Sequence, residues 1–165
     1  MAELTPSERL QPCLLDRLVD DQPDSKVESR DQRVVSMRRY RDGVLRDLNW
    51  LLNTGCRSSE DHLEDYPEVA RSVLNYGTPD LCGQTASGVS PEQIERNVIK
   101  AIQAFEPRII RNSLSIRPAV EQNAMSHNAV FLEIRGELWA LPAPEVLYVK
   151  TQVDLETGQC ELKGG

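Results

Sequence analysis

The run Phe105-Glu106-Pro107-Arg108 constrains the fold of this chain more than any other segment, because a helix must end there. Upstream of it, apolar residues recur every three or four positions, and Ser90-Pro91 is typical of a helix start. Pro107 cannot continue the helix, since it has no N–H to donate. The sequence therefore predicts a helix over residues 91–105, whose apolar face comprises Ile94, Val98, Ala101, Ile102 and Phe105.

Beyond Pro107 the apolar pattern changes from a helical period to the period of a strand. Alternating apolar and polar residues predict strands over residues 110–117, 130–139 and 146–153, the first of them closed by Pro118. A turn signal follows at residues 154–158, and residues 159–162 are expected to return as a short hairpin arm. The carboxy-terminal half is thus predicted to be a small sheet with the preceding helix on it.

The amino-terminal half has the pattern of helices. Its best segment spans residues 34–52 and is expected to end at a glycine C-cap, Gly55. One face of this segment is apolar and comprises Met37, Tyr40, Val44, Leu48 and Leu51; the other carries Arg38, Arg39, Arg41 and Arg46. The arginines are interpreted as a solvated face, with contact to an acidic partner as the alternative. A short second helix is predicted over residues 67–74.

These elements predict an α+β fold: amino-terminal helices and one long helix packed on a small, mostly antiparallel sheet of three to four strands. A length of 165 residues suits one domain. Residues 1–33 are expected to form a flexible or docking amino-terminal arm, because a short leucine-rich stretch is followed there by a polar run. Residues 34–165 are expected to form a single α+β domain.

Glu106 and Arg108 are the first candidates for a functional site. They flank Pro107 between two apolar segments, so they cannot easily avoid partial burial, and a buried charge must be paired. Two readings stay open from sequence. The pair can be an internal salt bridge that orients the strand against the helix, or it can contact a partner directly, for example through a bidentate arginine–carboxylate contact.

Composition excludes several function classes. A net charge of −7 argues against nucleic acid as the main partner, and no stretch approaches the roughly 18 apolar residues of a membrane span. The start lacks the apolar core of a signal peptide, so a cytoplasmic location without direct membrane insertion is expected. The four cysteines are far apart and the two histidines lack ligand spacing, so no metal, cofactor or catalytic residue is predicted.

Several motifs occur together in an order typical of one family: Leu14-Leu15-Asp16-Arg17-Leu18, Asn49-Trp50-Leu51-Leu52-Asn53-Thr54, Ser72-Val73-Leu74-Asn75-Tyr76-Gly77 and Phe105-Glu106-Pro107-Arg108. With these residues the chain resembles TssE, the baseplate protein of bacterial type VI secretion systems. That family is similar to the small wedge protein of contractile phage tails, which is sometimes called lysozyme-like. The Glu-Pro-Arg joint is its hallmark.

The resemblance implies a structural role in a baseplate docked at the inner face of the cytoplasmic membrane. The implied partners are the wedge proteins TssF and TssG, with TssK nearby, and the sheath subunits TssB and TssC. Partner-binding residues are expected at the joint, on the arm, at an exposed strand end and along the edge of the last strand and its hairpin: Glu106, Pro107, Arg108, Asp16, Arg17, Leu18, Trp139, Val149, Thr151, Val153 and Asp154.

Two other function classes compete with this reading. A peptidoglycan muramidase needs two carboxylates across a cleft, one of them protonated, and Arg108 beside Glu106 favours the ionised form instead. Analogy of fold does not transfer activity, so an enzyme is not expected. An adaptor of the same fold, working through residues 1–33 and the loop at residues 57–65, is the other alternative.

Overall fold

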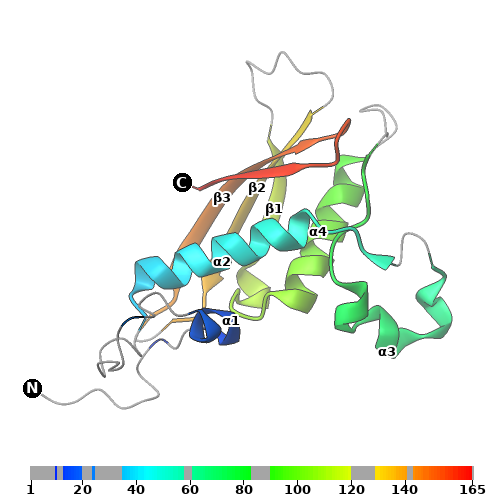
Figure 1. Cartoon of the computed structure of the whole chain (residues 1–165). Helices are drawn as coiled ribbons and strands as arrows, with labels where there is room; N and C mark the ends of the chain where they lie inside the picture. Colours follow the sequence, from blue (N-terminus) through cyan, green and yellow to red (C-terminus); the bar gives the residue numbers. More distant parts are fainter. Residues whose placement is uncertain are drawn as a thin grey trace, which may run out of the picture.

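The computed structural model describes residues 10, 13–19, 24, 35–57, 61–82, 90–119, 129–140 and 143–164. Its helices are α1 (Leu14–Leu18), α2 (Met37–Leu52), α3 (Pro67–Ala70) and α4 (Pro91–Phe105), with 3-10 turns at Leu63–Asp65, Val73–Asn75 and Arg111–Ser113. Its strands are β1 (Ser115–Ala119), β2 (Ala129–Leu138), β3 (Glu145–Asp154) and β4 (Cys160–Gly164). The α+β prediction is confirmed (Figure 1).

The four strands form one antiparallel sheet in the order β1-β2-β3-β4. Ile134 of β2 lies opposite both Ile116 of β1 and Val149 of β3, so these three side chains share a face. All three are buried. The register therefore places the alternating apolar residues of every strand on one side of the sheet, as their sequence pattern predicts.

Both long helices cover that apolar side of the sheet (Figure 1). Helix α4 packs on β1, and α2 packs on β4 and on α4. The core between them includes Val44, Leu48 and Leu51 of α2, Ile94, Val98 and Ile102 of α4, and Leu132, Ile134, Leu138, Leu147 and Val149 of the sheet. The short helix α3 projects away from this body (Figure 1).

The ends of the two long helices differ in detail from the expectation. Helix α2 begins at Met37 rather than at residue 34, because the Ser36 hydroxyl accepts the Arg39 N–H and caps the helix. The predicted glycine C-cap is wrong: Asn53 caps α2, and Gly55 pairs with Thr78 instead. Helix α4 has the predicted bounds, but the Ser90 hydroxyl bonds to Glu92 and not to the helix backbone.

A glycine is required where the chain after the 3-10 turn at Val73–Asn75 returns to α2. Gly77 has a φ of 125°, and a Cβ at this position would lie 2.2 Å from the Thr54 carbonyl oxygen. The close approach lets the Thr78 N–H donate to Thr54 and the Cys56 N–H donate to Thr78. These two bonds tie the segment containing Tyr76 to the carboxyl end of α2.

The first strand is shorter than predicted, and Pro118 does not close it. Residues 111–113 form a 3-10 turn, because the Ser113 hydroxyl donates to the Ile110 carbonyl and accepts the Glu137 N–H. Strand β1 starts at Ser115 and continues through Pro118, which pairs with Leu132. Since β1 is an edge strand, one of its sides needs no ladder bonds, and a proline is tolerated there.

The predicted helix over residues 67–74 is interrupted. Helix α3 ends at Ala70, and a separate 3-10 turn, η5, covers Val73–Asn75. Ser72 separates the two elements, because its hydroxyl donates to the Val69 carbonyl and accepts the Leu74 N–H. Such local side-chain bonds compete with a continuous helix.

Candidate functional site at the Glu106-Pro107-Arg108 joint

Glu106 stabilises the joint between α4 and the sheet through hydrogen bonds to residues on both sides of it. Its N–H caps the last turn of α4 by donating to the Ile102 carbonyl at 2.8 Å. Its carboxylate, only 4% exposed, accepts the Arg108 backbone N–H at 3.1 Å and the Arg108 Nε at 2.7 Å. The Arg108 Nη2 also bonds to Glu106. Glu106 and Arg108 thus form a bidentate internal pair that fixes the direction of the chain across Pro107.

The pair belongs to a larger set of charges that reaches the amino-terminal arm. Arg108 Nη2 donates to Asp47 on α2, whose other oxygen accepts Arg46 Nε at 2.9 Å. Arg46 Nη1 in turn lies 2.6 Å from Asp16 of α1. We call Asp16, Arg46, Asp47, Glu106 and Arg108 the charge network. It connects α1, α2 and the joint, which lie far apart in sequence.

The network favours the charged forms of Arg108 and Asp16. Burial alone lowers the pKa of Arg108, but hydrogen bonds and charges from Glu106 and Asp47 outweigh it and raise that pKa above its usual value. For Asp16, burial raises the pKa, and the stronger combined effect of the Cys13 thiol and Arg46 lowers it below its ordinary value. At neutral pH Arg108 is therefore a charged partner of Glu106 and Asp47, and Asp16 is a charged partner of Arg46.

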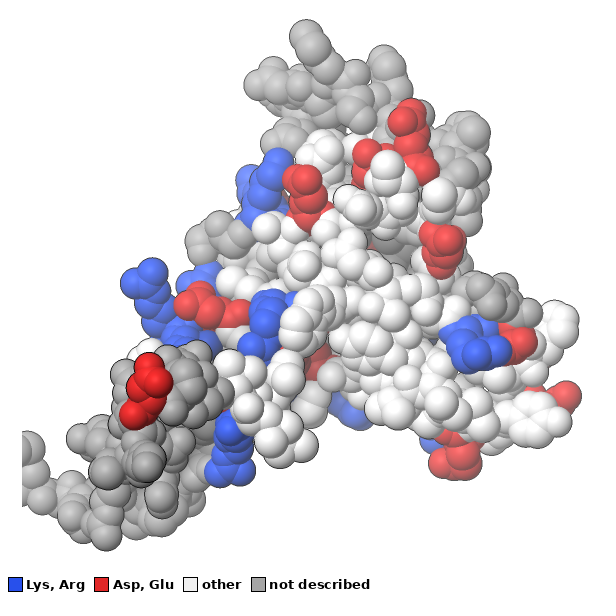
Figure 2. Space-filling view, viewed as in Figure 1, with Lys and Arg blue, Asp and Glu red and all other residues white. Residues whose placement is uncertain are grey.

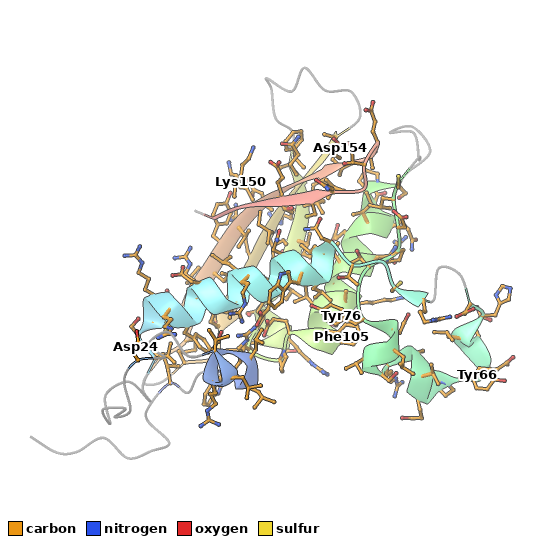
Figure 3. All side chains as sticks on the ribbon, in the orientation of Figure 1. Asp24, Tyr66, Tyr76, Phe105, Lys150 and Asp154 are labelled. Atoms are coloured by element: carbon orange, nitrogen blue, oxygen red, sulfur yellow. The ribbon has the colours of Figure 1, made fainter. Side chains whose placement is uncertain are left out.

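A groove with a volume of about 660 Å³ opens beside the network. Charged side chains line part of it, and large apolar side chains line the rest: Asp47, Glu106 and Arg108, with Leu10, Leu15, Tyr40, Trp50, Leu51, Tyr76, Phe105, Pro107 and Trp139. Tyr76 and Phe105 meet edge to face with their ring centroids 5.2 Å apart (Figure 3). Trp50 and Trp139 are 48% and 55% exposed, an unusual degree of exposure for tryptophan. We call this surface the joint groove.

The backbone around Trp139 holds its indole beside the joint. The Trp139 N–H donates to the Arg108 carbonyl at 2.8 Å, and the Tyr40 hydroxyl donates to the Trp139 carbonyl at 3.1 Å. The structure thus brings four of the predicted residues, Glu106, Pro107, Arg108 and Trp139, into one groove. Trp50 and Tyr76 also line it.

The residues predicted on the arm separate into different environments. Asp16 lies in the charge network, whereas Arg17 and Leu18 are exposed on α1. Gly43 of α2 makes room for the Asp16 carboxylate beside Arg46, because a Cβ at position 43 would lie 3.3 Å from Asp16 Oδ2. Leu10 and Leu15, which belong to the leucine-rich stretch of the predicted arm, line the joint groove.

The residues predicted along the last long strand are not at an edge. Strand β3 pairs with β2 on one side and β4 on the other, and Val149, Thr151 and Val153 are buried beneath the helices. The expectation that these three side chains face a partner at an edge is therefore wrong. Asp154 is the last residue of β3, and its carboxylate accepts the Glu156 N–H of the hairpin turn at 2.7 Å.

The free edge of the hairpin belongs to β4. At its start, the Cys160 N–H and carbonyl face away from β3 and bond to the Asn53 side chain, both at 2.9 Å. Because backbone direction alternates along a strand, the N–H and carbonyl of Leu162 also face outward. In the described part of the chain no strand lies beyond β4.

The chemistry available at the joint is that of a rigid ion-pair site. Both oxygens of Glu106 accept bonds from Arg108, whereas a general acid must carry a proton to donate. Within the described residues, acidic, histidine and cysteine side chains do not gather in a group that could hold a metal ion. Nor does any described helix have the length and apolar character needed to cross a bilayer.

Residues 38–143 match the family model described as baseplate wedge protein gp25. The matched range runs from the start of α2 past the end of β2 and contains Asp47, Trp50, the joint and Trp139. Neither a curated protein nor a solved structure shows a significant match to the chain. Since the match covers well over half of the sequence, the chain belongs to the gp25 family of baseplate wedge proteins, structural components of phage-tail-like baseplates.

Proposed function

We propose that this protein is the TssE component of a type VI secretion baseplate and that it binds the wedge proteins TssF and TssG through the joint groove. It works in the cytoplasm, in a baseplate docked at the inner face of the cytoplasmic membrane, with TssK nearby. The observation that carries the proposal is the family match across the groove, together with two exposed tryptophans on the groove walls.

The surface of the groove suits a protein partner. Uncharged residues cover much of the middle of the face that carries α2 (Figure 2). Half-exposed tryptophan side chains are the type that most often dominates binding energy at protein interfaces. Two hydrogen bonds hold the Trp139 backbone, and its side chain is 55% exposed, so the exposed part of the indole is available to a partner.

The charge network supports this function by fixing the shape of the groove. Two carboxylates already occupy Arg108, so its bidentate contact is internal and not made to a partner. A buried ion pair holds its geometry closely, because removal of either member leaves an uncompensated charge. The network thus presents Trp139 and the joint to the wedge proteins in one arrangement.

The edge of β4 suits the second expected role, as the platform for the sheath subunits TssB and TssC. An edge strand offers N–H and carbonyl groups that another chain can complete by strand addition. In β4 these groups belong to Leu162, whereas Asn53 occupies those of Cys160. A sheath strand would therefore pair with β4 downstream of Cys160.

Replacement of Trp139 by alanine is expected to weaken binding to co-expressed TssF and TssG by about 2–4 kcal/mol, because an exposed aromatic anchor is lost. The free energy of unfolding should change little, since the Trp139 side chain is more than half exposed. Co-purification of the tagged chain and a titration give the dissociation constant. The matched control is Tyr66→Ala, which removes an aromatic side chain that is 61% exposed (Figure 3). Tyr66 directly precedes α3, the short helix that projects away from the sheet and the long helices. Equal binding by both variants would contradict the groove as interface.

Replacement of Leu162 by proline is expected to abolish sheath assembly while leaving the binding of TssF and TssG intact. Proline removes an outward N–H from β4, whose pairing with β3 does not use it. Leu162→Val keeps the N–H and serves as the control. Sheath formation can be followed in cells with fluorescent TssB. Normal sheaths in a folded Leu162→Pro variant would contradict the role of this edge.

A further inference from the structure

The joint groove has an uncompensated negative charge. Its charged lining consists of two carboxylates, Asp47 and Glu106, and one guanidinium, Arg108. Behind them, Arg46 and Asp16 lie 2.6 Å apart and balance each other. The complete network has three carboxylates and two guanidiniums, so both counts leave one negative charge beside an apolar groove.

The negative charge affects Tyr76, a residue in the wall of the groove. Tyr76 lines it, and burial first, then the Asp47 and Glu106 carboxylates, raise the pKa of its hydroxyl. Both named charges at this wall are negative. A positive group that enters from solvent would therefore be attracted towards the Tyr76 side of the groove.

The aromatic walls also suit a cation. The Arg46 guanidinium already lies 5.1 Å from the centroid of the Trp50 ring. Trp139, Tyr76 and Phe105 present further ring surface to the same groove. Cations are attracted to aromatic faces, and more strongly when both groups are removed from water.

We infer that the joint groove receives an apolar segment of the partner that inserts one arginine or lysine side chain between Trp139 and the Asp47–Glu106 carboxylates. This inference rests on the proposed function and specifies the chemistry of the bound segment. The cation completes the charge balance of the network, and the apolar neighbours cover Trp50, Trp139 and Leu15.

An acidic segment does not fit the same groove. The Nε and Nη2 of Arg108 already donate to Glu106 and Asp47. A partner carboxylate would add a further negative charge beside these two and would be repelled. The charges of the groove therefore favour a positive side chain of the partner over a negative one.

The sign of the partner's charge can be tested by placing first a positive and then a negative side chain at one position in the groove. Leu15 lines the groove and is 40% exposed on α1, so lysine and glutamate are both tolerated there by a helix. In the full chain, the dissociation constant for the TssF–TssG complex is measured for wild type, Leu15→Lys and Leu15→Glu. Leu15→Lys is expected to bind about tenfold more weakly than Leu15→Glu, because only lysine repels an incoming cation.

A control pair of variants tests whether the effect depends on where the charge is placed. The same exchange at Val73, which is exposed on η5 outside the groove lining, should leave the two dissociation constants equal. Equal binding of the Leu15 variants, or tighter binding of Leu15→Lys, overturns the inference while the proposed function stands. Absence of wild-type binding overturns both.

Discussion

Replacement of Arg108 by alanine is expected to lower the free energy of unfolding by about 3–5 kcal/mol. The reason is the carboxylate that remains: Glu106 is 4% exposed and loses its guanidinium partner, whereas Asp47 keeps Arg46. Urea unfolding followed by circular dichroism measures the change. The wedge complex should also be lost, because the chain direction after α4 is no longer fixed.

Two further variants separate burial from charge pairing. Arg135→Ala removes an arginine that is 57% exposed and pairs with Glu133 on the sheet surface, so the free energy of unfolding should change little. The double variant Glu106→Gln, Arg108→Met leaves no unpaired buried charge and should recover part of the stability lost in Arg108→Ala. If Arg108→Ala were as mild as Arg135→Ala, the joint would not depend on the pair.

The second large effect is expected from Leu138→Ala, a loss of about 2–5 kcal/mol in the free energy of unfolding. Leu138 is fully buried at the end of β2, where Ile109 pairs with it just after the joint. Its removal leaves a cavity directly beneath the groove. Thermal and urea unfolding measure the loss.

Leu138 and Trp139 are neighbours that should behave in opposite ways. Folded Leu138→Ala, studied at low temperature, should still bind TssF and TssG, since the removed side chain does not face the groove. Trp139→Ala should stay stable and lose binding. Loss of both properties in both variants would mean that the groove and the core are not separable.

Local signals predicted most of the fold. Helix α4 begins at Pro91 and ends at Phe105 as expected, and β2 and β3 lie within one residue or so of their predicted bounds. These elements have clear periods and clear stops. The first strand and the helix at residues 67–74 were mispredicted, because Ser113 and Ser72 make local bonds that a periodic pattern does not reveal.

Part of the site could also be predicted. An internal pair of Glu106 with Arg108 is one of the two readings that the sequence leaves open, and the structure shows this pair. The rest of the network could not be found, because Asp47 lies 61 residues from Arg108 and the contact depends on how α2 crosses the joint. Arg46 was read as part of a solvated face for the same reason.

The edge of the sheet was predicted for the last long strand together with its hairpin, and in the described residues it belongs to the return strand of that hairpin, β4. The pattern of Val149, Thr151 and Val153 correctly predicts a strand, but alternation does not show how many neighbours a strand has. A five-residue β4 after the turn makes β3 interior. Whether β3 lies at an edge or in the interior of the sheet depends only on whether β4 pairs with it.

A photo-crosslinking amino acid placed at position 139 tests the central claim most directly, because it reports what covers the joint groove in assembled baseplates in the cell. The predicted result is a covalent adduct with TssF or TssG from position 139 and none from position 66, next to α3 (Figure 3). Adducts with the wedge proteins from position 66 and none from position 139 would contradict the assignment of the joint groove as the wedge interface.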